Sequence, residues 1–206
     1  PVYFTARNAV MLDALERAVG SGAREEEIDR LAAQPAVATA RKLLAAAKVS
    51  AVLLALDDLE AAGEPVLVFS SHVGPAQEIG ERQGWTLITG DVTGERRGKI
   101  RTDFQAGRWS SALGGGSRAG ADAWGVSMTI RAASEGLTLT RAAYVAFVDR
   151  DWVPSRNLQA VARAHRDAGR ARFPRRQVEV ELRRSDRRRG FGAVGLVELA
   201  VVEDRG

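Results

Sequence analysis

Apolar residues recur at helical spacing through the first third of the chain. The pattern predicts helices over residues 5–19, 24–33 and 38–62, and Gly63 follows the last of them as a helix-ending residue. Several apolar residues fall near one face of the third helix, which we expect to be its buried face. They are Leu44, Ala51, Leu54 and Leu59.

From residue 65 onward, short apolar runs alternate with helical segments. The runs have the length and continuous apolar character of strands buried on both faces. They occupy residues 65–69, 85–89, 126–130 and 144–148, and helices are predicted over residues 74–83, 94–104 and 155–166. The alternation predicts an α/β fold, a parallel sheet flanked by helices, with a helical N-terminal extension. Ligands of such sheets bind beyond the carboxyl ends of the strands.

Two segments do not follow this alternation. Residues 110–125 are rich in glycine and predict a flexible insert. Residues 178–182 and 194–202 alternate weakly between apolar and polar, and an arginine run separates them, so the pattern leaves open whether they fold. The predicted organisation is an extension (1–37), a core (38–170) and an arginine-rich tail (171–206).

Positive charge is concentrated toward the end of the chain. The formal net charge is +4, but residues 1–150 carry 17 basic and 18 acidic side chains, whereas residues 151–206 carry 13 and 8. Of the 30 basic residues 27 are arginine, a side chain that binds phosphate groups bidentately. A GC-rich genome would also encode most positive charge as arginine, so composition alone leaves both readings open.

Composition excludes several classes of site. There is no cysteine, and His72 and His165 are the two histidines, so we expect no disulfide, thiol catalysis or metal cluster. No apolar run reaches the ~18–20 residues of a membrane span, and the first ten residues lack an export signal. We therefore expect a cytoplasmic protein, or a nucleoid or nuclear one in a eukaryote, with no membrane partner.

Motifs for autonomous catalysis are incomplete. The stretch from Gly94 to Lys99 has one residue too few between its glycines for a phosphate loop, and it lacks the following Ser or Thr. Asp149 ends an apolar strand as a metal-binding carboxylate would, but Arg150 stands where a second acid is expected. Ser71 and His72 follow a strand without the glycine elbow of a hydrolase. This chain is not expected to hold a triphosphate alone.

The most informative cluster lies on the predicted helix over residues 155–166. Gln159, Arg163 and Arg166 are spaced by four and three, so all three project from one helix face. Two permanent cations beside an amide suit a polyanion, and in particular the charge that develops on a transferred phosphoryl group. A solvated basic helix face is the alternative. Ser155 is expected to cap this helix.

Six sequence blocks then resemble a known module in their order and spacing. They are residues 66–72 (VLVFSSH), 90–96 (GDVTGER), 104–105 (FQ), 132–140 (AASEGLTLT), 151–154 (DWVP) and 159–166 (QAVARAHR). Together they resemble the second RecA-like lobe of superfamily-two helicases, in particular the Swi/Snf-type DNA translocases and their annealing-helicase relatives. The resemblance covers about residues 40–166.

The resemblance implies roles for individual residues. Arg163 and Arg166 would be arginine fingers that reach ATP across the cleft between two lobes, and Gln159 would couple that cleft to DNA. Glu135 and Gly136 would sense the nucleotide. The residues implied in nucleic-acid binding are Ser70, Ser71, His72, Gly90, Thr93, Leu137 and Thr138. Trp152 and Pro154 would have a packing role.

The same resemblance implies ATP with Mg²⁺ as ligand, bound mainly by a first lobe outside these 206 residues. The implied partners are double-stranded DNA and an N-terminal RecA-like lobe, in cis or in trans. We therefore expect the chain alone to hydrolyse ATP negligibly. A non-enzymatic nucleic-acid-binding module, or a decayed remnant of such a lobe, is the alternative, and an RNA helicase lobe fits residues 151–166 less well.

The sequence departs from the family pattern in three places. Asp167 begins a divergent segment where the family continues with Ile-Gly-Gln, Val153 replaces the usual Asn, and residues 110–125 replace a short link. A truncated, rearranged or frame-altered carboxyl end is the hypothesis that these departures suggest.

Overall fold

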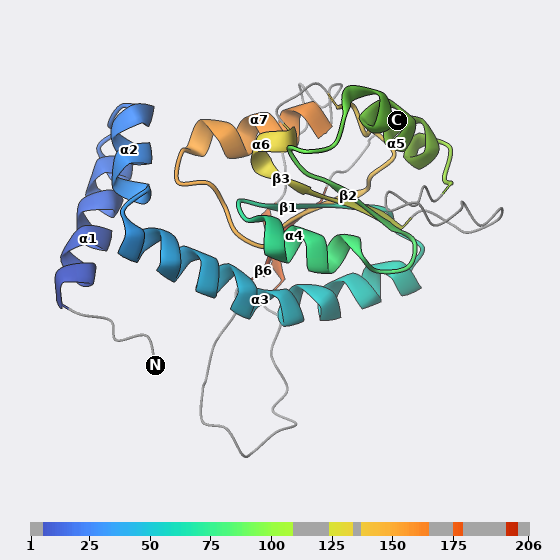
Figure 1. Ribbon diagram of the computed structural model, residues 1–206. Coiled ribbons are helices and arrows are strands. Elements are labelled where there is room, and N and C mark those ends of the chain that lie inside the picture. Colours follow the sequence, from blue (N-terminus) through green and yellow to red (C-terminus); the bar gives the residue numbers. More distant parts are fainter. Residues whose placement is uncertain (1–5, 109–123, 134–136, 165–174, 179–196, 202–206) are drawn as a thin grey trace, which may run out of the picture.

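The structure is a computed structural model that describes residues 6–108, 124–133, 137–164, 175–178 and 197–201 (Figure 1). The helices are α1 (Ala6–Gly20), α2 (Glu25–Ala32), α3 (Pro35–Ala61), α4 (Val73–Gly80), α5 (Gly94–Gln105), α6 (Ile130–Ala133) and α7 (Pro154–Ala164). The strands are β1 (Val66–Ser70), β2 (Trp85–Ile88), β3 (Gly125–Thr129), β4 (Tyr144–Phe147), β5 (Arg175–Val178) and β6 (Val197–Val201).

The strands form one sheet in the order β2-β3-β1-β4-β6-β5. The first four are parallel, with Val66 of β1 opposite both Gly125 of β3 and Tyr144 of β4. The predicted α/β fold with a parallel sheet is therefore confirmed. β6 pairs antiparallel with β4, and β5 pairs antiparallel with β6. Thus part of the arginine-rich tail joins the sheet, and β6 lies within the weakly alternating residues 194–202.

Helices cover both faces of the sheet (Figure 1). Alternate β1 residues point to opposite faces, so Leu67 and Phe69 pack toward α5, α6 and α7, whereas Val66 and Val68 pack toward α3 and α4. At the start of β3, a Cβ on Gly125 would lie 2.4 Å from the Trp85 ring. Any larger residue would therefore clash with the indole, which packs against the backbone at this position.

The buried face of α3 differs in part from the predicted one. Leu44 and Leu54 are 61% and 53% exposed, whereas Ala51 is buried and Leu59 is partly buried against the same core, as predicted. The residues that α3 buries against the sheet and α4 are Val49, Ala51, Val52, Ala55 and Leu56. Because apolar residues occur around most of this helix, periodicity does not single out one stripe, and packing against the sheet selects it.

The N-terminal helices form a third core. Leu15, Ile28 and Val37 pack together, and Val153 from the turn before α7 completes the cluster at 1% exposure. α3 begins at Pro35, three residues before the predicted start, because proline is favoured in the first helical turn. The helical N-terminal region is confirmed, and the division at residues 37 and 170 stays a prediction. None of the helices in the described residues has the length and apolar character needed to cross a bilayer.

Candidate functional site

The carboxyl ends of the paired strands β1 and β4 lie side by side at one end of the sheet. The chain leaves β1 into α4 on one face and leaves β4 toward α7 on the other, which is the arrangement of a ligand-binding switch point. Ser70 and Asp149 meet there: the Ser70 hydroxyl donates to Asp149 Oδ1 at 2.5 Å. The backbone N–H of Ser71 donates to both carboxylate oxygens at 3.1 and 3.2 Å. Asp149 therefore ties the two strand ends together.

The three predicted residues after β1 have different environments. Ser70 is fully buried, and its hydroxyl also accepts the His72 backbone N–H at 3.0 Å. Ser71 Oγ and His72 Nε2 are buried atoms without a hydrogen-bond partner. His72 Nε2 lies 3.8 Å from Asp149 Oδ2. Ser71 and His72 thus each have a polar atom without a hydrogen bond at the carboxyl end of β1, whereas the Ser70 hydroxyl is fully used in hydrogen bonds within the fold.

The cluster does not have the geometry of a hydrolase triad. In a triad a histidine ring nitrogen accepts the serine proton and the carboxylate orients the histidine. Here the Ser70 hydroxyl bonds directly to the Asp149 carboxylate, and the contact between Ser70 and His72 is made by the His72 backbone.

The loop between β2 and α5 holds Gly90 and Thr93. Thr93 precedes α5 and caps it, because its hydroxyl accepts the Arg96 N–H at 3.4 Å. Gly90 is exposed, and a Cβ there would meet nothing within 4 Å. Arg97 is 6% exposed, and its Nη2 donates to the carbonyl oxygens of Thr89 at 3.1 Å and Gly90 at 3.4 Å. Arg97 therefore shapes this loop.

Sequence reasoning missed Arg97, and it considered Asp149 only as a metal-binding carboxylate at the end of a strand. The signal for Arg97 is its helical register, because it lies three residues before Ile100 and seven before Phe104, both buried in the core. No comparable local signal exists for the pairing of Asp149 with Ser70, which lie 79 residues apart.

The loop after β3 is described only in part. Glu135 and Gly136, the predicted nucleotide sensors, lie outside the described residues. Leu137 is 6% exposed and belongs to the core between the sheet and α5–α7, so its side chain does not face solvent. Thr138 is half-buried.

Helix α7 carries the predicted arginines. Ala160 is buried against the sheet, whereas the neighbouring Gln159 is exposed. Arg163 lies within α7, but its side chain is outside the described part of the structure, as is the whole of Arg166. The expected capping role of Ser155 is not found: the helix begins at Pro154, and the Ser155 hydroxyl donates to Glu25 Oε1 at 2.5 Å.

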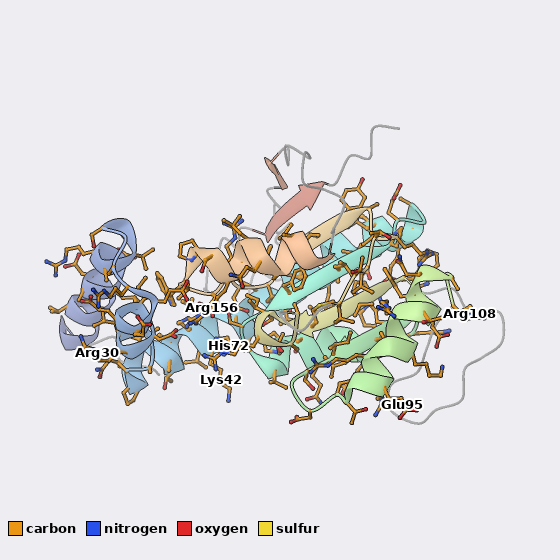
Figure 2. All side chains as sticks on the ribbon, turned by 90° about the horizontal axis from the view of Figure 1, so that it is seen from above. Arg30, Lys42, His72, Glu95, Arg108 and Arg156 are labelled. Atoms are coloured by element: carbon orange, nitrogen blue, oxygen red, sulfur yellow. The ribbon has the colours of Figure 1, made fainter. Side chains whose placement is uncertain are left out.

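Charged side chains surround the turn between β4 and α7. Figure 2 shows Arg156 and His72 where the N-terminal helices meet the sheet edge. The hydrogen bonds from Arg156 lower the pKa of Asp29, and the same bonds raise the pKa of Arg156. Burial lowers the pKa of Arg41, which is also close to Asp151 and Asp149.

Among the described residues, no group of three or more His, Asp or Glu side chains could hold a metal ion.

Comparison with known proteins identifies the fold family. Residues 47–168, more than half of the chain, match the family described as "Helicase conserved C-terminal domain". A solved structure, "Crystal structure of the C-terminal part of Fun30 ATPase domain", is similar at 20% identity and a TM-score of 0.46. The similarity covers 58% of this chain and 36% of the chain in the solved structure. This chain therefore spans about a third of the length of that protein chain. No match was found among curated proteins. From the family match, we conclude that this chain belongs to the helicase conserved C-terminal domain family.

Proposed function

We propose that this helicase C-terminal lobe is the second motor lobe of a DNA-dependent ATPase of the Swi/Snf type. Helicase domains use ATP in general, and a C-terminal lobe pairs with an N-terminal one. The observation that carries the proposal is the position of α7, which follows the carboxyl end of β4 and exposes Gln159. Arg163 and Arg166 follow Gln159 by four and seven residues in the sequence, which is the spacing of positions on one face of a helix.

In this proposal the two arginines stabilise the charge that develops on the γ-phosphoryl group during hydrolysis. ATP with Mg²⁺ is held mainly by the first lobe, and this chain contributes cations rather than metal ligands. Gln159 couples the nucleotide cleft to DNA, and Glu135 and Gly136 sense the nucleotide. Closing and reopening of the two lobes then advances the motor along duplex DNA.

The DNA side of the proposal uses the strand ends. Ser71 and His72 are partly exposed residues, and each has a polar atom without a partner that a rotation of the side chain would present to phosphate oxygens. The exposed residues Gly90 and Thr93 would offer backbone and hydroxyl donors, as would Thr138. Ser70 acts through Asp149 rather than by contact, and Leu137 is left with its backbone only.

The test supplies an N-terminal RecA-like lobe to the chain and measures DNA-stimulated ATP hydrolysis. Arg163→Ala is expected to lower the rate about 10³-fold while DNA affinity barely changes, because an arginine finger acts on the transition state. Arg17→Ala is the matched control, since the Arg17 side chain is 71% exposed and pairs within α1 with Asp13. The chain alone is expected to hydrolyse ATP negligibly.

A non-enzymatic nucleic-acid-binding module gives the opposite result. In that case Arg163→Ala weakens DNA binding and reduces the salt dependence of the affinity by about one unit of slope, because one phosphate contact is lost. No ATPase activity would then appear with the first lobe present.

A further inference from the structure

Hydrogen bonds join helix α2 to the first turn of α7, directly after the turn that connects β4 to α7. Arg156, in the first turn of α7, donates from Nη1 to Asp29 Oδ1 at 2.7 Å and from Nη2 to Asp29 Oδ2 at 2.6 Å. Glu25, one turn earlier on α2, accepts the Ser155 hydroxyl. A bidentate arginine–carboxylate pair fixes orientation as well as distance. The start of α7 is therefore oriented by α2.

The same turn is held by apolar contacts. Val153, directly before α7, is 1% exposed and packs with Leu15 of α1, Ile28 of α2 and Val37 of α3. The half-buried Trp152 packs against the same cluster. The turn thus inserts into the core of the N-terminal helices rather than into the core of the sheet.

Helix α3 supplies the third contact. Arg41 Nη2 donates to the Arg150 carbonyl oxygen at 3.2 Å, and the Arg41 guanidinium lies 5.7 Å from the centroid of the Trp152 ring. Both contacts stabilise the chain segment between β4 and α7. All three N-terminal helices therefore contact this one turn.

We infer that the α1–α2 hairpin is a positioning element for α7, and that Asp29 is its positioning residue. Residue 163 lies seven residues after Arg156, about 10 Å along the helix axis, so a tilt of about 10° at the start of α7 displaces residue 163 by about 2 Å. Such a displacement is large for a catalytic group, because about 1 Å of misplacement can cost 10²-fold in rate. The inference rests on the proposed function, since it assigns the hairpin the role of aiming Gln159 and Arg163 at the nucleotide cleft.

The first arm of the test measures the helix itself in the full-length chain. Asp29→Asn removes the charge but keeps the size of the side chain, and Asp29→Glu restores the carboxylate. Asp57→Asn is the matched control, because Asp57 is also on an N-terminal helix and pairs with Arg82, away from α7. Amide exchange over residues 157–162 is expected to be roughly threefold faster in Asp29→Asn than in the wild type, with Asp29→Glu and Asp57→Asn unchanged.

The second arm measures DNA-stimulated ATPase with an N-terminal lobe supplied. Asp29→Asn is expected to lower kcat roughly tenfold with little change in the KM for ATP, because the arginine acts on the transition state. Asp29→Glu is expected to restore most of kcat. In an Arg156→Gln background, Asp29→Asn is expected to have no further effect, because the pair is already broken.

The outcomes separate the two proposals. An active wild type whose kcat is unchanged by Asp29→Asn, or α7 exchange that is unchanged, would overturn the positioning role and leave the proposed function standing. A loss of kcat shared equally by Asp29→Asn and Asp57→Asn would also overturn it, because the effect would then be general. Absence of DNA-stimulated ATPase in the wild type would instead overturn the proposed function.

Discussion

Two neighbouring serines at the end of β1 have opposite hydrogen-bonding environments. Ser70 Oγ donates to the Asp149 carboxylate, whereas Ser71 Oγ is buried without a partner. A buried hydroxyl without a partner costs free energy, and the proposed DNA contact of Ser71 would offset that cost. Ser70 therefore stabilises the fold, whereas Ser71 is the serine to which the proposal assigns DNA binding.

Alanine substitutions at these positions are expected to have different effects. Ser70→Ala should lower the free energy of unfolding by about 1–2 kcal/mol, because it removes a hydrogen bond to a charged group. Ser71→Ala should leave stability unchanged or raise it slightly, yet weaken DNA binding. Urea denaturation and DNA titration at fixed salt measure the two effects. Equal destabilisation by both variants would show that Ser71 is also a structural residue.

At the scale of elements, helix α2 and helix α7 are joined by a partly exposed ion pair. Asp29 is 42% and Arg156 25% exposed, so water screens the attraction. The pKa of Asp29 lies below its usual value of 3.8, mainly because of the hydrogen bonds from Arg156. A carboxyl whose folded pKa is lowered contributes stability above its unfolded pKa, and this is lost as the pH falls through the folded value.

The contribution of this ion pair to the free energy of unfolding should therefore change with pH only in the acidic range. Between pH 7 and about pH 5, the wild type should be more stable than Asp29→Asn by about 0.5–1 kcal/mol, a figure that allows for screening. The difference should shrink toward zero below about pH 4, as the carboxyl becomes protonated. Thermal melts of both proteins from pH 7 to pH 3 measure it. A difference as large at pH 3 as at pH 7 would mean that size or packing, not charge, stabilises the contact.

On the scale of the whole molecule, the N-terminal helices and the sheet share a structural element. Val153 lies within residues 47–168, which match the helicase C-terminal domain family, yet its side chain is buried in the core formed by α1, α2 and α3. α3 in turn packs against the sheet through residues such as Val52 and Leu56. Because each part buries surface of the other, the two parts should unfold together.

A core substitution at the junction tests this cooperativity. Val153→Ala should lower the free energy of unfolding of the whole chain by about 2 kcal/mol, because it leaves a cavity in the shared core. Val10→Ala is the control, since Val10 is 65% exposed on α1. Circular dichroism should show one transition that shifts for Val153→Ala and stays in place for Val10→Ala. Two separate transitions would mean that the helices and the sheet are independent folding units.

Local sequence patterns determined the class of fold and the edge of the sheet at which the candidate site lies. A strand buried on both faces needs a continuous apolar run, and a crossover helix needs a period of 3.6, so both can be seen within a dozen residues. The runs at residues 65–69 and 144–148 therefore predicted β1 and β4. The six sequence blocks predicted a helicase C-terminal lobe, and the family match confirmed it.

Tertiary structure alone decided which distant groups meet. The pairs Ser70–Asp149 and Asp29–Arg156 are 79 and 127 residues apart, and no local period relates their members. The buried face of α3 was likewise chosen by the sheet, because several faces of that helix are apolar enough to be buried. Local periodicity indicates whether a segment forms a helix or a strand, whereas the buried face of an evenly apolar helix and the partners across the chain depend on how the packed elements are placed.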